Sequence, residues 1–300
     1  MKKVIFLLIL VLILVLTFHY KETILIYYNR YFESKYFVPT KLEKNEYARN
    51  YNFKYVSLTD NFLPNNKQDI LNVYYTVINS GMDEFIFYCK KEYETCFDDV
   101  KDVANNQTTI SNINNFVHPY NGFKDIQTEI DTVGKITIKI NRNYSDKMIT
   151  ILDYEINKII SENINNSMSD SDKVKIIHDY IINNTTYDQN RSDNNIKQYE
   201  SDNAYGALIE GHALCGGYTD AMMLFLEKFN IESYKISSTN HIWNYLKLNG
   251  TWYNLDLTWD DPISQDGRNI LDHKFFLIST DEMLNIDKTE HVFDKTVYGE

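Results

Sequence analysis

The chain has 300 residues, enough for one large domain or two modest ones with a buried core. Hydrophobic residues make up 43% and charged residues 24%, a composition that excludes a disordered chain. The sequence has 24 Tyr and 16 Phe but only 10 Gly and 4 Pro, which excludes a collagen-like or linker-rich chain. The net charge of −12, with no basic cluster to reverse it locally, argues against nucleic acid as a partner.

The first twenty residues combine a positive start with an apolar run. Lys2 and Lys3 precede an unbroken apolar stretch from Val4 to Phe18. Positive charge ahead of such a run keeps the N-terminus in the cytoplasm and sends the rest across the membrane. The run is shorter than the roughly 20 residues that span a bilayer, although its flanks can extend it. Because no small-residue cleavage site follows, residues 1–20 are predicted to be a retained single-pass signal anchor, with a cleaved signal peptide and a secreted protein as the alternative.

Residues 21–165 are predicted to form a smaller α/β region, whose role the sequence does not assign. Residues 21–60 lack a clear period and are interpreted as a stalk or an irregular entry to the fold. Hydrophobic periodicity then favours regular elements. These are a helix over residues 69–78, two strands within residues 126–140 that break at Gly134, and a helix after Ser145.

Three cysteines are present: Cys89, Cys96 and Cys215. Outside the cytoplasm Cys89 and Cys96 could form a disulfide across a short loop, but two nearby thiols can equally be separate buried residues. Under either alternative Cys215 is left over. An unpaired cysteine in an exported protein is a candidate reactive thiol.

Turn-forming residues from 165 to 172 mark the predicted joint before a catalytic domain at residues 166–300. Ser171 or Asp172 is expected to cap the next helix. A polar loop is predicted from about residue 183 to 203.

The segment around Cys215 predicts a nucleophile at the start of a helix. After Gly211 to Gly217, apolar residues recur at helical spacing, which places Cys215 at the helix N-terminus. Unpaired N–H groups and the helix dipole favour a thiolate there. The backbone N–H of Cys215 could also stabilise an oxyanion, with Asn203 and Tyr205 as candidates for the second donor on proximity alone.

A β-hairpin supplies a partner for the thiol. Asn249-Gly250 lies between two alternating, aromatic-rich runs, the strongest short hairpin signal. A two-residue turn there places Trp243 opposite Asp256, so that His241 lies diagonally across from Asp256 on the same face. Diagonal neighbours are roughly 7–8 Å apart, within reach of these side chains. The other face of the hairpin is apolar and is expected to pack on a core.

These features predict a nucleophile–base–orienter triad. Cys215 attacks, His241 takes and returns the proton, and Asp256 fixes the imidazole. The alternative is that His241 is only a strand residue satisfied by Asp256. A zinc site built on His212 and Cys215 is disfavoured, because no second Cys or His pair has ligand spacing.

Three segments resemble bacterial transglutaminase-like domains. Gly211 to Ala221 is similar to the nucleophile segment of that family, and His241 to Asn244 and Trp252 to Pro262 are similar to its His and Asp segments. The similarity covers about residues 170–285. It implies an α+β, papain-like core in which a nucleophile helix packs on an antiparallel sheet, here behind an N-terminal membrane anchor and a smaller α/β region. It also places the family triad on Cys215, His241 and Asp256.

The resemblance implies an extracytoplasmic thiol enzyme that attacks protein or peptide amides through a thioester, as a peptidase, an amidase or a cross-linking enzyme. The alternative is an inactive domain that binds peptide or cell wall. Gly216 follows the nucleophile, as in bacterial relatives, where the large animal transglutaminases have Trp. No 12-residue calcium loop is found, and no cofactor or metal is expected.

Overall fold

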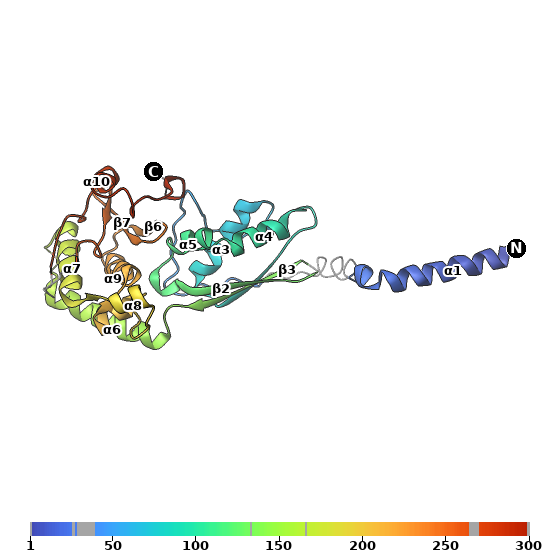
Figure 1. The fold of residues 1–300 in the computed structure, drawn as a ribbon, viewed down its shortest axis with the longest axis horizontal. Helices are drawn as coiled ribbons and strands as arrows, with labels where there is room; N and C mark the ends of the chain where they lie inside the picture. The colour runs from blue at the N-terminus through green and yellow to red at the C-terminus, as the bar shows by residue number, and fades with distance from the viewer. Residues whose placement is uncertain are drawn as a thin grey trace.

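The structure, a computed structural model, describes residues 2–25, 28, 40–132, 134–165, 167–263 and 270–298. Residues 26, 27 and 29–39, which belong to the predicted stalk, lie outside the described residues. In Figure 1 the helix α1 (Lys2–His19) projects away from the other elements, which together form a mixed α/β body.

The predicted membrane anchor is not supported. Helix α1 does form over the apolar run from Val4 to Phe18. Within the described ranges, however, no helix is both long enough and apolar enough to cross a membrane. The physical reason is length: the uninterrupted apolar run is shorter than the roughly 20 residues that cross a bilayer, and the helix ends on charged or polar residues, Lys2, Lys3 and His19.

A three-stranded sheet and three helices build the first part of the body. They are α3 (Lys67–Ser80), β1 (Glu84–Tyr88), α4 (Cys96–Asn105), α5 (Gln107–Asn114), β2 (Phe123–Ile130) and β3 (Lys135–Arg142). The strand order is β1-β3-β2, and both pairs are antiparallel. The predicted helix and the two strands around Gly134 are confirmed, and the φ of 107° at Gly134 suits glycine in particular. Cys89 and Cys96, whose pairing the sequence left open, form a disulfide with their Cα atoms 5.7 Å apart.

The short helix η1 (Pro119–Asn121) lies between α5 and β2. A largely helical segment follows the sheet and contains α6 (Asp146–Asn163), α7 (Asp170–Asn184), β4 (Thr186–Tyr187), α8 (Gln189–Asn194), the π-helical turn η2 (Gly206–Glu210) and β5 (His212–Ala213). Helix α6 begins after Ser145, as predicted. The cap of α7 was predicted wrongly: Ser169, rather than Ser171 or Asp172, accepts the first-turn N–H.

The predicted polar loop at residues 183–203 also needs correction, because it contains two short elements. Asp188 caps α8 by accepting the N–H of Arg191. Strand β4 pairs in parallel with β5, with Thr186 opposite His212. This pairing joins residues far apart in the chain, so local periodicity does not indicate it.

The last part of the body places a helix on an antiparallel sheet. Its elements are α9 (Cys215–Lys228), β6 (Ser233–Ser237), β7 (Ile242–Leu248), β8 (Thr251–Leu255), α10 (Thr280–Ile286) and α11 (Lys295–Tyr298). The sheet order is β6-β7-β8. The hairpin register is confirmed, with Leu248 opposite Thr251, and the turn residues Asn249 and Gly250 have φ of 51° and 84°.

The sheet β6-β7-β8 is buried on both faces, whereas only the apolar face was expected to pack on a core. Leu246, Leu248 and Leu255 pack with α6, α7 and α9. Trp243 and Tyr245, on the other face, belong to a buried cluster that also includes side chains of α3, α4 and α5, and Trp243 directly contacts Phe293. Core contacts therefore cross the predicted boundary between residues 165 and 166. The division into domains at 1–20, 21–165 and 166–300 stays a prediction.

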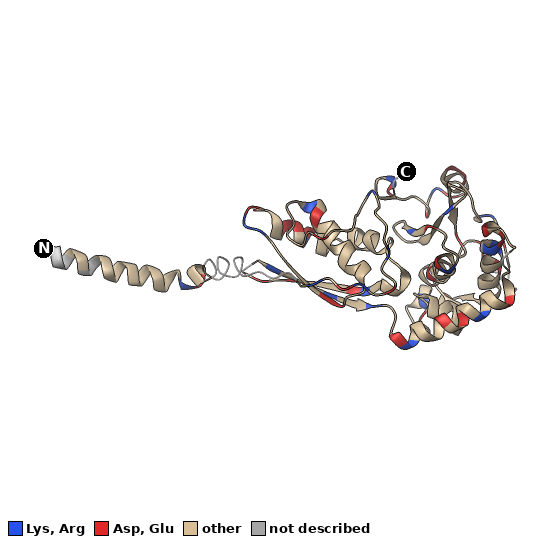
Figure 2. Cartoon of the chain, turned by 180° about the vertical axis from the view of Figure 1, so that it is seen from behind, with Lys and Arg blue, Asp and Glu red and all other residues tan. Residues whose placement is uncertain are grey.

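Acidic and basic residues alternate along the outer helices α6 and α7 (Figure 2). Salt bridges join Lys158 to Glu155 and Lys173 to Asp170 at a spacing of three residues. Such partly exposed pairs contribute about 0–1 kcal/mol each. The fold therefore depends on its two buried cores rather than on these surface pairs.

Candidate active site

Cys215 is the first residue of α9, as predicted, and its side chain is half-buried. The two glycines after it allow backbone of residues 201–203 to press against the helix start. A Cβ on Gly217 would lie 2.5 Å from the carbonyl oxygen of Ser201, and a Cβ on Gly216 would lie 2.9 Å from that of Asp202. Glycine at both positions is therefore required by close backbone approach.

A buried ion pair holds the body of α9 against the sheet. The Nζ of Lys235 lies 2.9 Å from an Asp220 carboxylate oxygen, and both side chains are about 5% exposed. The Tyr144 hydroxyl donates to the other Asp220 oxygen at 2.8 Å and accepts the N–H of Ala204. These bonds fix the helix that carries Cys215 relative to β6 and to the segment before η2.

His241 and Asp256 flank the ends of β7 and β8, and both are buried. The Nε2 of His241 lies 2.5 Å from Asp256 Oδ2. The Cys215 thiol lies close enough to His241 to raise the pKa of the imidazole, and both residues line the same cleft. Since Nε2 faces the carboxylate, Nδ1 is the ring nitrogen left to face the thiol. The structure thus brings together all three residues predicted for the site.

The charges of His241 and Asp256 stabilise each other. Burial opposes a charged imidazole, but the charge of Asp256 and the hydrogen bonds to Asp256 and Cys215 outweigh burial and raise the pKa of His241 to about 10. Burial likewise opposes charge on Asp256, but the charge and hydrogen bonds of its histidine partners hold the pKa of Asp256 below its ordinary value. At neutral pH the site therefore holds an imidazolium paired with a carboxylate.

The thiol opens onto a cleft of about 380 Å³. Tyr187 and Trp259 give its wall aromatic surface, and Asp261 and Glu290 give it carboxylates. Among the described residues of this wall there is no Lys or Arg. Burial raises the pKa of Asp261 to about 6, although a hydrogen bond from Tyr218 works in the opposite direction.

A comparison with protein families identifies the part of the chain that carries these residues. The family model described as the transglutaminase-like superfamily matches residues 158–257, a stretch that includes Cys215, His241 and Asp256. The chain contains a transglutaminase-like domain. No curated protein matches the chain.

Two solved structures share a distant likeness with the chain. One is a TGase with 17% identity, covering 49% of this chain and 47% of that one, at a TM-score of 0.36. The other is a proposed cysteine protease from Cytophaga hutchinsonii with 12% identity, covering 51% and 69%, at a TM-score of 0.27. The chain spans about half the length of the TGase.

The second oxyanion donor stays unassigned. The side-chain oxygen of Asn203 accepts the N–H of Tyr205, and neither residue belongs to the described wall of the cleft. His212, the other half of the disfavoured zinc site, stacks on Tyr199 with ring centroids 3.9 Å apart.

Two clusters in the transglutaminase-like domain and its C-terminal flank contain metal-ligand types. They are His178, Asp179 and His273, and His241, Asp256 and His291. Zinc–nitrogen and zinc–oxygen bonds of about 2.0–2.2 Å place neighbouring ligand atoms about 3 Å or more apart. Closer pairs, such as 2.5 Å in one cluster and 2.6 Å in the other, are instead hydrogen bonds. In the first cluster the ammonium group of Lys175 also lies 2.6 Å from a carboxylate oxygen of Asp179. Neither cluster therefore has the geometry of a metal site.

Sequence analysis missed His291, which forms a second contact with Asp256. Its Nε2 lies 2.9 Å from Asp256 Oδ2, the same oxygen that His241 approaches. His291 follows α10 in a segment with no regular element, and no motif or period singles it out. Only the packing of the chain brings it to the site.

Proposed function

We propose that this protein is a thiol enzyme that attacks amides of proteins or peptides through a thioester on Cys215. The observation that carries the proposal is a half-buried thiol at a helix start that opens onto a cleft and contacts His241, which is itself bound to Asp256. The transglutaminase-like domain supports it, because the matched residues include all three side chains.

The reaction uses these residues in two steps. The proton of Cys215 resides on His241, so the sulfur attacks the amide carbonyl carbon as a thiolate; the C–N bond breaks, and the imidazolium of His241 gives that proton to the leaving amine. The acyl group stays on sulfur as a thioester. Water or a second amine then attacks the thioester carbonyl carbon, neutral His241 takes the proton of that nucleophile, and the C–S bond breaks, which returns the thiolate and the imidazolium. Hydrolysis gives an acid, and transfer to an amine gives a new amide.

The experiment uses p-nitrophenyl acetate, a reactive acyl donor that needs no special recognition. Wild-type protein should release a burst of p-nitrophenolate equal to the enzyme concentration and carry an acetyl group on Cys215, read by mass spectrometry. Without a burst or an acetyl adduct the enzyme proposal fails, and the domain is better understood as a binding module for peptide or cell wall.

We also propose that the body works outside the cytoplasm. The Cys89–Cys96 disulfide supports this, since such bridges persist in oxidising compartments. A membrane-impermeant maleimide applied to intact cells should label Cys215 in a Cys89→Ser, Cys96→Ser variant only after the protein has been exported. Labelling that requires cell lysis would contradict the location.

A further inference from the structure

His291 forms hydrogen bonds with carboxylates through both of its ring nitrogens. Nε2 lies 2.9 Å from Asp256 Oδ2, and Nδ1 lies 2.9 Å from Asp287 Oδ2. A carboxylate whose pKa lies below the ordinary value is ionised at neutral pH and can only accept hydrogen bonds, and both Asp256 and Asp287 are of this kind. The side chain of His291 therefore bridges Asp256 and Asp287, with one ring nitrogen at each carboxylate.

Three aromatic rings enclose the side chain of His291. The side chain is fully buried, and the rings of Trp243, Trp259 and Phe275 lie around it with centroid distances of 5.0, 4.8 and 5.0 Å. Phe275 stacks on the imidazole with an angle of 18° between the planes. Rings packed this closely leave the imidazole few alternative orientations.

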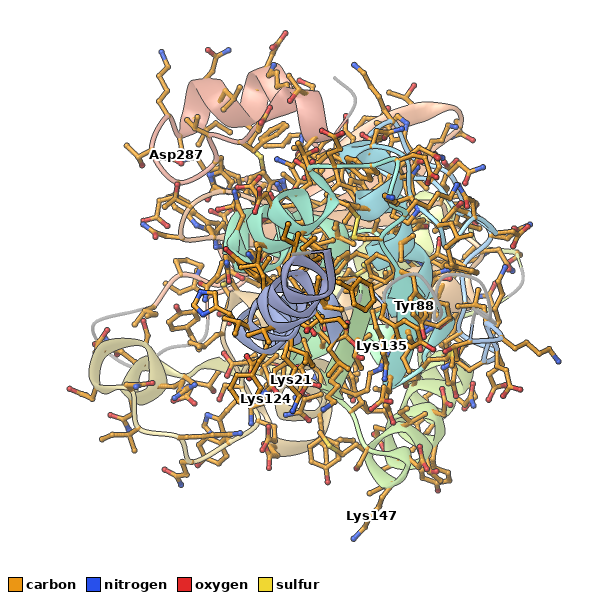
Figure 3. The ribbon with its side chains drawn as sticks, turned by 90° about the vertical axis from the view of Figure 1, so that its right-hand side faces the viewer. Lys21, Tyr88, Lys124, Lys135, Lys147 and Asp287 are labelled. Atoms are coloured by element: carbon orange, nitrogen blue, oxygen red, sulfur yellow. A yellow bond between two sulfur atoms is a disulfide. The ribbon has the colours of Figure 1, made fainter. Side chains whose placement is uncertain are left out.

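Asp287, the second carboxylate that binds His291, is itself held in place by hydrogen bonds. Asp287 lies in the loop after α10, at the periphery of the body (Figure 3). It accepts the backbone N–H groups of Glu290 and His291 in addition to the ring of His291. This turn holds the imidazole in the direction of Asp256.

The carboxylate of Asp256 is consequently fixed at each oxygen. Oδ1 accepts the backbone N–H groups of Thr258 and Trp259 at 3.0 and 3.2 Å. Oδ2 accepts from His241 and from His291. A rotation that moved Oδ2 away from His241 would break the bond to His291 at the same time.

We propose, building on the thiol-enzyme function above, that His291 is a positioning residue that holds Asp256 in line with His241 and shares its negative charge. A shared charge binds the proton of His241 less tightly than an undivided one would. His291 thus serves both the orientation of the base and the return of its proton to the leaving group.

The protein offers a matched control in His178. This residue is also fully buried between two carboxylates, with Nδ1 2.9 Å from Asp179 and Nε2 3.2 Å from Asp260. Asp260 lies four positions after Asp256 on the same loop, but among the described residues no hydrogen bond or salt bridge joins His178 to His241 or Asp256. Loss of either histidine removes a buried bridge, whereas only loss of His291 disturbs the proposed triad.

The test compares full-length wild type with His291→Phe, His291→Gln and His178→Phe, using p-nitrophenyl acetate below the melting temperature of each variant. His291→Phe should lower kcat on the order of 10- to 100-fold with little change in KM, because misplacement of a catalytic group costs up to about 10²-fold. Gln can still donate to Asp256 and should recover most of kcat. His178→Phe should lower the melting temperature but keep kcat within about threefold. Equal losses of kcat in His291→Phe and His178→Phe would overturn the proposal.

A second measurement decides the point without turnover. In protein labelled with ¹⁵N-histidine, His291→Phe should move the ring signals of His241 more than His178→Phe does. Unchanged His241 signals in His291→Phe would refute the positioning role even if wild type gave no burst. An absent burst together with the expected spectra would count against the enzyme function alone.

Discussion

The two ends of the proposed triad are built in contrasting ways. At the thiol end, Cys215 is half-buried, opens onto the cleft and has His241 as its side-chain partner. At the carboxylate end, Asp256 is about 1% exposed and its two oxygens accept four hydrogen bonds. The reacting atom is left accessible, whereas the group that orients the base is removed from solvent and fully bonded.

This contrast follows from what each end must do. A nucleophile needs access to a substrate and a base within reach. An orienting carboxylate needs a fixed geometry and a low local dielectric, both of which require burial and compensating hydrogen bonds. Substitutions at the thiol end should therefore change chemistry with little effect on stability, and substitutions at the carboxylate end should change both.

The largest effect is expected from Cys215→Ala. It should abolish acetylation and iodoacetamide labelling at position 215, because the nucleophile is gone. The melting temperature should stay within about 2 °C, since a small change at a half-buried site costs little. Peptide mass spectrometry and a thermal melt measure the two outcomes. A residual burst in this variant would mean that another group attacks the ester.

His241→Ala should lower p-nitrophenyl acetate turnover about 10²- to 10⁴-fold, the usual contribution of a general acid–base. In wild type the pKa of His241 is raised to about 10, so the imidazolium that protonates a leaving amine is present at neutral pH and is lost as the pH rises through about 10. Hydrolysis of a peptide p-nitroanilide should fall over that range. A wild-type profile without this alkaline fall would separate His241 from proton transfer.

Asp256→Asn tests the buried end through stability. The folded-state pKa of His241 is raised from 6.5, so its contribution to the free energy of unfolding is full below about pH 6.5 and is lost as the pH rises through about 10. The pKa of Asp256 is lowered from 3.8, so its contribution is present above about pH 3.8 and is lost as the pH falls below it.

Wild type and Asp256→Asn should therefore differ most between about pH 4 and 6.5, by about 3–5 kcal/mol, since the change leaves buried histidines without their counter-charge. Urea unfolding at pH 5.5 and at pH 10 measures this difference. The gap should narrow at the higher pH. A gap that is equal at both pH values would argue that Asp256 acts only through packing.

The smallest effect is expected from Asp261→Asn at the open end. The pKa of Asp261 is raised to about 6, so its carboxylate gains charge in the cleft as the pH rises through that value. We compare the rates at which a cationic methanethiosulfonate and its neutral methyl analogue modify Cys215. The ratio of the cationic rate to the neutral rate should rise about fivefold as the pH passes this value, for an attraction of about 1 kcal/mol. Asp261→Asn should remove this pH-dependent ratio and leave the neutral reagent unaffected.

The thiol end could be predicted from sequence because its determinants are local. Regular apolar spacing after Gly217 defines α9 and places Cys215 at its start. The Asn249-Gly250 turn sets the register of β7 and β8, which brings His241 and Asp256 together within a short stretch of chain. Periodicity and turn chemistry report interactions between sequence neighbours, and these interactions are sufficient here.

The tertiary structure decided the rest of the carboxylate end. The contact between Asp256 and His291 joins residues 35 positions apart, and that between His178 and Asp260 joins residues 82 apart. Tertiary packing also covered the second face of β6-β7-β8, where Trp243 contacts His291 and Phe293 and Tyr234 contacts Phe53 and Phe116. Hydrophobic burial has no preferred direction along the chain, and which distant segments meet depends on how whole elements pack. The sequence thus determined where the proposed nucleophile and its proposed base lie, and the packing of distant segments determined what holds them in place.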